Sequence, residues 1–84
     1  MALNKPNKRI VEFHIARLQD KNPEVRLKAI NELALLPDGD GLVALQAIFE
    51  KEEDPNVKKA AQEAGRKVFL LLKQQGSEAT GSGS

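Results

Sequence analysis

His14 is the side chain best suited to acid–base or metal chemistry at neutral pH, and it is the only histidine in the sequence. No Asp or Glu at ligand spacing accompanies it, and the chain has no cysteine. On a helix, His14 falls between the apolar residues Ile10 and Leu18. We therefore interpret it as a partly buried packing residue and expect neither a metal site nor a catalytic base there.

The segment Asp38-Gly39-Asp40-Gly41 superficially resembles a calcium loop. However, Leu42 stands where the third oxygen ligand belongs, and Phe49 stands where a bidentate Glu closes such a loop. We interpret the segment as a turn between two helices.

Other catalytic patterns are also missing from the sequence. It contains no Gly-rich phosphate loop, no Ser-His-Asp set at plausible spacing and no paired carboxylates in an apolar setting. The sequence therefore predicts a protein that is not an enzyme and that has no cofactor and no metal.

Basic residues recur at seven-residue spacing in the last third of the chain, at Lys59, Arg66 and Lys73, with Lys58 and Lys67 beside them. Such a stripe can follow nucleic-acid phosphates. The 13 basic and 12 acidic residues nearly cancel, however, and Glu63 interrupts the stripe. A solvated helix face is the favoured interpretation, and nucleic-acid binding ranks low.

Proline and glycine divide the 84 residues into four segments of helical length, predicted at 5–20, 23–36, 41–52 and 55–75. Asn22-Pro23 and Asp54-Pro55 each place an N-cap acceptor before a proline at the first helical position. Asp38 or Asp40 can cap the third helix, and Asn4 can cap the first ahead of Pro6. We expect one all-α domain over residues 1–75.

Apolar residues form one stripe on each predicted helix, and on the second helix they cover more than half the circumference. That helix should pack on two sides. Five further apolar residues have no assigned neighbour in a structure of only two hairpins: Phe13, Leu27, Ile30, Phe69 and Leu70. They either pack at the ends of the fold or mediate self-association.

An internal repeat relates the two halves at an offset of 32 residues, which aligns Asn22-Pro23 with Asp54-Pro55 and Ala29 with Ala61. Upstream, removing one residue from the second inter-helix turn aligns Val11 with Leu42, His14 with Leu45 and Leu18 with Phe49.

The segment from Leu18 to Arg26, followed by Ala29 and Leu33, resembles the HEAT-repeat superfamily, particularly its short bacterial, phycobilin-lyase-like and idealised engineered types. The second half matches less closely, because Glu52, Lys58 and Gly65 replace the residues expected from Asp20, Arg26 and Leu33. The resemblance implies an α-α superhelix of two antiparallel hairpins.

In such repeats the turn Asp and the helix-start Arg tie neighbouring turns together. The resemblance therefore implies structural roles for Asp20 and Arg26, with Glu52 and Lys58 as conservative substitutes, in partly exposed pairs that contribute about 0–1 kcal/mol each.

The second helix of each pair would line a concave face where partners usually bind. The candidate binding residues there are Lys28, Asn31, Glu32, Lys59, Gln62 and Arg66.

These observations predict a cytoplasmic, non-catalytic protein-interaction module with no membrane span. The alternative is a self-assembling scaffold, either a dimer or an end-to-end stack, because two repeats are fewer than most solenoids need. Residues 76–84 are expected to form a disordered Gly/Ser tail, and Gly81–Ser84 resembles a linker added to recombinant proteins. Whether the chain is natural or engineered stays open.

Overall fold

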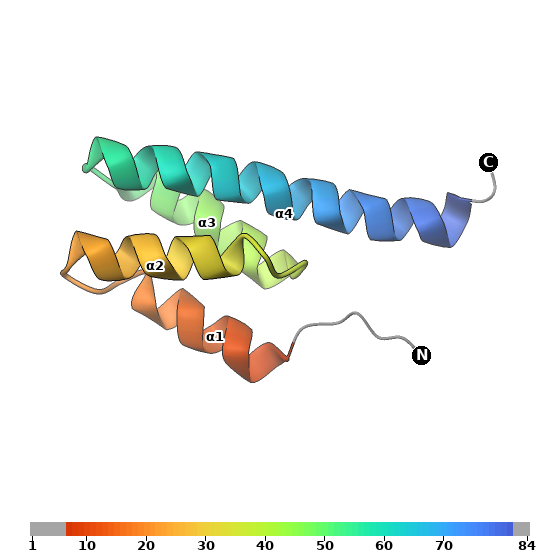
Figure 1. Ribbon diagram of the computed structural model, residues 1–84, viewed down its shortest axis with the longest axis horizontal. Coiled ribbons are helices and arrows are strands. Elements are labelled where there is room, and N and C mark those ends of the chain that lie inside the picture. The colour runs from red at the N-terminus through yellow and green to blue at the C-terminus, as the bar shows by residue number, and fades with distance from the viewer. Residues whose placement is uncertain (1–6, 82–84) are drawn as a thin grey trace.

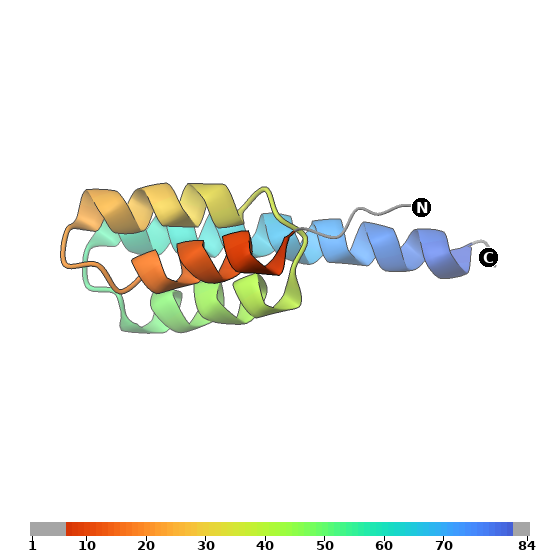
Figure 2. The same cartoon turned by 90° about the horizontal axis from the view of Figure 1, so that it is seen from below.

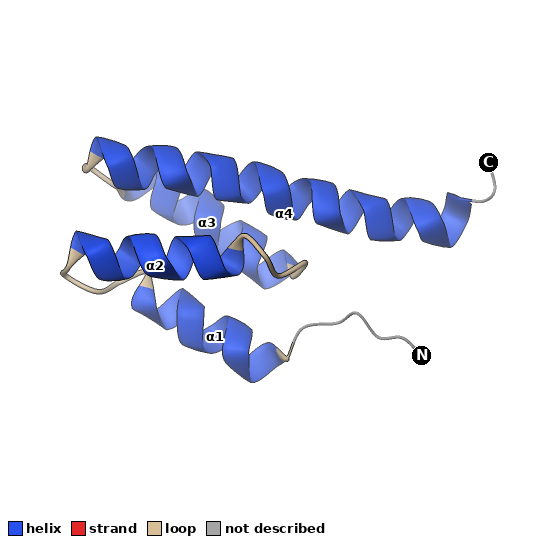
Figure 3. Ribbon diagram, viewed as in Figure 1, coloured by secondary structure: helices blue, strands red, loops and turns tan. Residues whose placement is uncertain are grey.

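A computed structural model describes the backbone of residues 7–81 and the side chains of residues 7–75. Within that part of the chain there are four helices and no strand: α1 (Lys8–Arg17), α2 (Pro23–Leu33), α3 (Gly39–Lys51) and α4 (Pro55–Gly81) (Figure 3). The predicted all-α fold of two helical hairpins is confirmed. None of the described helices is both long and apolar enough to span a membrane.

Each of the four helices begins at a side chain that accepts hydrogen bonds from backbone N–H groups. Asn22 accepts from Glu24 at 2.9 Å, and Asp54 accepts from Asn56 at 2.8 Å. Asp38, rather than Asp40, caps α3. Asn7 caps α1, whereas the predicted cap Asn4 lies outside the described residues.

Several helix bounds differ from the expected positions. The helix α1 spans 8–17 rather than 5–20, and α3 spans 39–51 rather than 41–52. The helix α2 ends at Leu33 rather than at residue 36. Pro37 disfavours helical backbone at the residue before it. The residues after Leu33 therefore form a turn with hydrogen bonds between residues three apart. Similarly tight turn bonds follow Arg17 at the end of α1. In contrast, α4 runs six residues past the expected end at residue 75, since each residue added to a formed helix gains one hydrogen bond.

The two hairpins, α1–α2 and α3–α4, stack on one another. The helix α2 packs beside α4 and α1 packs beside α3, so the helices form two layers (Figures 1 and 2). The C-terminal half of α4 continues beyond the ends of the other three helices. The fold is elongated, with principal extents of 44 × 23 × 14 Å.

The core lies between the two hairpins and takes residues from all four helices. Its fully buried side chains with the largest volume are Leu18, Ile30, Leu33, Leu45, Val11, Val57 and Val68. Gly41 lets α3 approach α2 closely, since a Cβ at that position would lie 3.4 Å from Cδ2 of Leu33. Ile30 in α2 and Ala34 at its C-terminal end are both buried, which fits the prediction that this helix packs on two sides.

Candidate functional site

Arg26 joins the turn between α1 and α2 to the turn between α3 and α4. Its Nε and Nη2 donate to the two carboxylate oxygens of Glu52 at 2.9 and 2.8 Å, and its Nη1 donates to the carbonyls of Asp20 and Lys21 at 2.8 and 3.0 Å. The Arg26 and Glu52 side chains are only 17% and 5% exposed. The expected partly exposed, weak pair is instead largely buried, because the stacked hairpins bring the two turns together.

The other two predicted turn residues have different roles. The Asp20 carboxylate accepts a hydrogen bond from the Asn22 backbone at 2.8 Å, and Glu52 accepts one from Asp54 at 3.1 Å in the matching place. Lys58 does not reach a carboxylate; its Nζ lies 4.7 Å from the ring centroid of Phe49. The hydrogen bond from Arg26 lowers the pKa of Glu52 below its ordinary value.

A second ion-pair cluster connects the start of α1 to the start of α3. Lys8 Nζ lies 2.7 Å from Asp38 and 3.0 Å from Asp40. Burial on its own would raise the pKa of Asp38, but hydrogen bonds from Lys8 and from the Gly41 and Asp40 N–H groups hold it below its ordinary value. The calcium-like segment is therefore a helix start whose charge is balanced by a lysine. Sequence reasoning missed Lys8, which is far away in the chain.

His14 is half-buried between α1 and α2, and its Nδ1 has no hydrogen-bond partner among the described residues. Its ring meets Phe13 edge to face, with centroids 5.2 Å apart. Among residues 7–81, no group of three His, Cys, Asp or Glu side chains is placed to hold a metal ion.

A groove lies on the outer side of the α3–α4 hairpin, and we call it the α3–α4 end groove. Its volume is about 560 Å³. It is lined by Leu42, Leu45, Gln46, Phe49, Glu50, Ala61, Gln62, Gly65, Arg66 and Phe69. Apolar residues therefore form much of its lining, while the charges come from Glu50 on α3 and Arg66 on α4.

The internal repeat explains why this groove is open. Two of its residues, Leu45 and Ala61, match His14 and Ala29 of the first hairpin and are themselves buried. Five others differ in burial from their counterparts in the first hairpin at the repeat offset. These pairs are Val11 and Leu42, Leu18 and Phe49, Ile30 and Gln62, Leu33 and Gly65, and Ala34 and Arg66. In every pair the first residue is buried, while the second is half-buried or exposed. On the first hairpin the second hairpin covers the matching surface. On the second hairpin no residue of the described part of the chain covers it, and this leaves the groove open.

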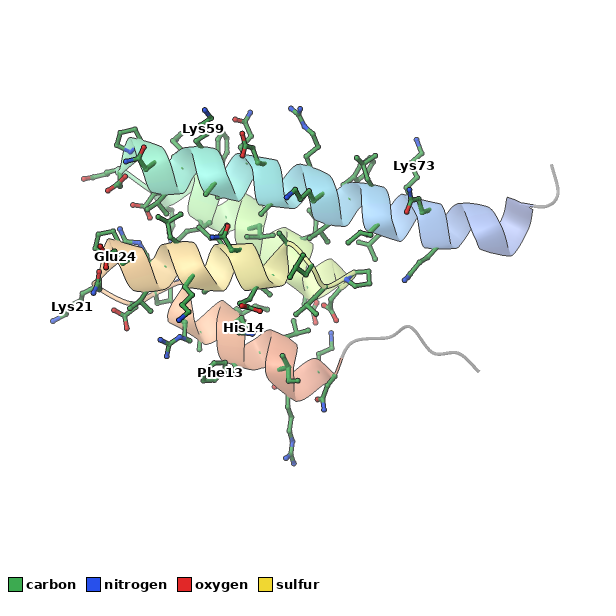
Figure 4. The ribbon with its side chains drawn as sticks, viewed as in Figure 1. Phe13, His14, Lys21, Glu24, Lys59 and Lys73 are labelled. Atoms are coloured by element: carbon green, nitrogen blue, oxygen red, sulfur yellow. The ribbon has the colours of Figure 1, made fainter. Side chains whose placement is uncertain are left out.

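A smaller groove of about 270 Å³ lies at the opposite end of the stack, and we call it the α1–α2 end groove. It is lined by Phe13, His14, Arg17, Lys28, Ala29 and Glu32. The Arg17 guanidinium lies 5.3 Å from the ring centroid of Phe13. Figure 4 shows Phe13 on the side of α1 that points away from α4.

The third groove, of about 390 Å³, lies between the end of α2 and the extended part of α4. Its lining includes Leu35 and Leu70, which are both exposed large apolar residues. Leu35 was not singled out from the sequence, because it was expected to lie in the last turn of the second helix rather than in the turn that follows it.

The predicted binding residues are all exposed, but they divide between different surfaces. Lys28 and Glu32 line the α1–α2 end groove, whereas Gln62 and Arg66 line the α3–α4 end groove. Asn31 lines none of the three grooves described above. Neither does Lys59, which projects from α4 on the same side as Lys73 (Figure 4).

The predicted self-association residues also separate. Ile30 is fully buried and cannot form an external contact, whereas Leu27 is half-buried against the core. The wide apolar arc of α2 faces both α1 and α4, which accounts for the burial of Ile30. Phe13, Phe69 and Leu70 remain about half exposed, each in a different groove.

A family model for HEAT repeats matches residues 1–65. No curated protein and no solved structure matches the chain significantly. The matched range takes in α1, α2 and α3 and continues into α4 as far as Gly65. Together with the stacked hairpins and the repeated turn chemistry, this match shows that the chain belongs to the HEAT-repeat family.

Proposed function

We propose that the chain is a non-catalytic protein-binding module and that its recognition site is the α3–α4 end groove. The observation that carries this proposal is the difference in burial between matching positions in the two hairpins. Positions buried in the first hairpin, such as Ile30 and Leu33, are uncovered in the second as Gln62 and Gly65. HEAT repeats are generally non-catalytic modules that mediate protein interactions.

The composition of the groove favours a protein partner. Apolar area surrounded by polar groups is the usual arrangement of protein interfaces, and aromatic and arginine side chains contribute most of their binding energy. Phe49, Phe69 and Arg66 supply these types, and Gly65 leaves space between them for a side chain of the partner.

Capture experiments with three immobilised proteins test this proposal: the wild type, Arg66→Glu and Lys73→Glu. Both substitutions reverse one exposed charge on α4, but only Arg66 lines the groove. A partner retained by the wild type and Lys73→Glu but lost with Arg66→Glu supports the groove as its site. A partner retained equally by all three proteins argues against it.

A self-assembling scaffold is the second candidate function. The exposed Phe13, Phe69 and Leu70 favour it, because large apolar residues in surface grooves commonly mark association sites. The two candidates differ in the occupant of the groove, which is either another protein or another copy of this chain.

A further inference from the structure

The contact between the two hairpins provides a template for what can fill the α3–α4 end groove. Within the chain, α3 lies beside α1 and α4 lies beside α2. Repeating that step outward would place one more helical hairpin over the groove. The α1–α2 hairpin of another copy can supply it, because no described residue covers its outward side at the α1–α2 end groove.

The shapes of the two ends compensate for each other. Where the second hairpin presents Ala44, the first presents the larger Phe13 at the matching position. The receiving surface has lost volume correspondingly, since Gly65 occupies the position of Leu33. Inside the chain Gly41 lies against Leu33. In the repeated step Ile10 stands at the position of Gly41 and faces Gly65, so a larger incoming residue meets a smaller receiving one.

The charges of the two ends are also complementary. The repeated step sets an incoming α1 against α3 and an incoming α2 against α4. Arg17 on α1 then approaches the Glu50 side of the groove, and Glu32 on α2 approaches the Arg66 side. Both encounters join opposite charges, which favours this pairing over others.

The ion pair between neighbouring turns also has an equivalent between the two copies. Inside the chain, Arg26 of the first hairpin pairs with Glu52 in the turn of the next. In the repeated step, Lys58 takes the position of Arg26, and Asp20 of the incoming copy takes the position of Glu52. A third pair of opposite charges thus follows from the same register.

We propose that the α3–α4 end groove receives the α1–α2 end of a second copy, so that copies stack head to tail. This inference rests on the proposed function and names the partner of the same groove. The two contacting surfaces are different, so each added copy leaves another groove open and growth does not stop at a dimer. Because three charge pairs contribute, added salt weakens the association.

The test is the mass in solution, measured by sedimentation from low micromolar concentration up to about 1 mM. Wild-type mass should rise past that of a dimer with increasing concentration. Glu32→Arg and Arg66→Glu should each weaken association about tenfold or more, because each sets like charges together. Mixing the two variants should restore association, since the reversed charges then face each other.

Two substitutions serve as matched controls for these charge reversals. Glu12→Arg changes an exposed residue of α1 outside the groove, and Lys73→Glu does the same on α4. Both should associate like the wild type. Circular dichroism of all four variants verifies that the fold is kept.

Three results would overturn the proposal. The first is a wild-type protein that stays monomeric over the whole concentration range. The second is association that stops at a dimer and is weakened by Arg66→Glu but not by Glu32→Arg. This result would mean that the α3–α4 end grooves of two copies face each other. The third is a monomeric chain whose groove captures a different protein, which leaves the proposed function standing without self-assembly.

Discussion

At the scale of single residues, Arg26 is a polar side chain that links the two hairpins through their turns. Three of its nitrogens are used at once, two on Glu52 and one on the turn carbonyls. A planar guanidinium can make this set of contacts, whereas a lysine ammonium is a single point of charge. Removing the arginine would leave the Glu52 carboxylate nearly buried without its cation.

We therefore expect Arg26→Ala to lower the free energy of unfolding by more than an exposed ion pair contributes, because the Glu52 carboxylate would stay nearly buried without its cation. Arg26→Lys should recover only part of this loss. Urea denaturation followed by circular dichroism measures the change, with Lys21→Ala as the control at an exposed position. A loss below about 0.5 kcal/mol for Arg26→Ala would show that the contact contributes no more than a surface pair.

The pH dependence of stability follows from two carboxylates. The pKa values of Asp38 and Glu52 both lie below their ordinary values of 3.8 and 4.5. As the pH falls through that range the unfolded chain binds more protons than the folded chain, so the folded state loses stability. The stabilisation is fully present above the ordinary values and disappears at lower pH.

Urea denaturation in steps from about pH 7 to about pH 3 should show this decline below about pH 5. Glu52→Gln removes one of the two titrating groups, so its curve should start lower and fall less steeply. A variant curve parallel to that of the wild type would assign the acid sensitivity to other carboxylates.

The sequence could indicate some of these residues but not their partners. The repeat pattern singles out Asp20, Arg26, Glu52 and Lys58, yet the ion pair joins Arg26 to Glu52 of the next turn. Which turn lies beside which is decided by hairpin stacking, which a local pattern does not contain. Lys8 carries no motif at all, and its pairing with Asp38 depends on α1 and α3 lying together.

At the scale of elements, the sequence located to the residue the two helix starts that carry a proline, whereas the other two starts and all four helix ends differ from the predicted positions. Asn22-Pro23 and Asp54-Pro55 combine an acceptor side chain with a proline, a local signal that fixes where α2 and α4 begin. Helix ends depend on weaker terms. For example, Gly76 costs only about 1 kcal/mol relative to alanine, and α4 passes through it.

Gly65 offers a direct test of this element-scale reasoning. It lies inside α4, where glycine is less favourable than alanine, and an added Cβ would lie 3.8 Å from Cδ1 of Leu42, an ordinary contact distance. Gly65→Ala should therefore raise the free energy of unfolding by about 0.5–1 kcal/mol. Thermal and urea denaturation measure this, and a destabilised variant would mean that α3 and α4 approach more closely than described.

At the scale of the whole molecule, the two ends of the stack differ in a way that the sequence only partly revealed. The repeat alignment shows that Gly65 replaces Leu33, but it does not show that both positions face outward along the stack. Only the packing of α2 on α4 identifies one as covered and the other as open. The same packing places Ile30, which the sequence left without an assigned neighbour, in the core.

The burial of Ile30 leads to a prediction about cooperativity. Ile30 and Leu33 belong to the first hairpin and are buried, whereas their counterparts in the second hairpin, Gln62 and Gly65, are exposed and half-buried. In repeat proteins, stability is shared between the repeats and their interfaces. Neither hairpin should therefore keep its structure once this interface is weakened.

Ile30→Ala should accordingly lower the free energy of unfolding by about 2–4 kcal/mol and speed amide hydrogen exchange in all four helices together. Leu70→Ala, which shortens a half-exposed residue of similar size, should change stability by less than about 1 kcal/mol. Exchange followed by mass spectrometry resolves the two hairpins. If α1 and α2 exchange faster in Ile30→Ala while α3 and α4 stay protected, the hairpins are independent units, and a lone α3–α4 hairpin is stable enough to present its groove.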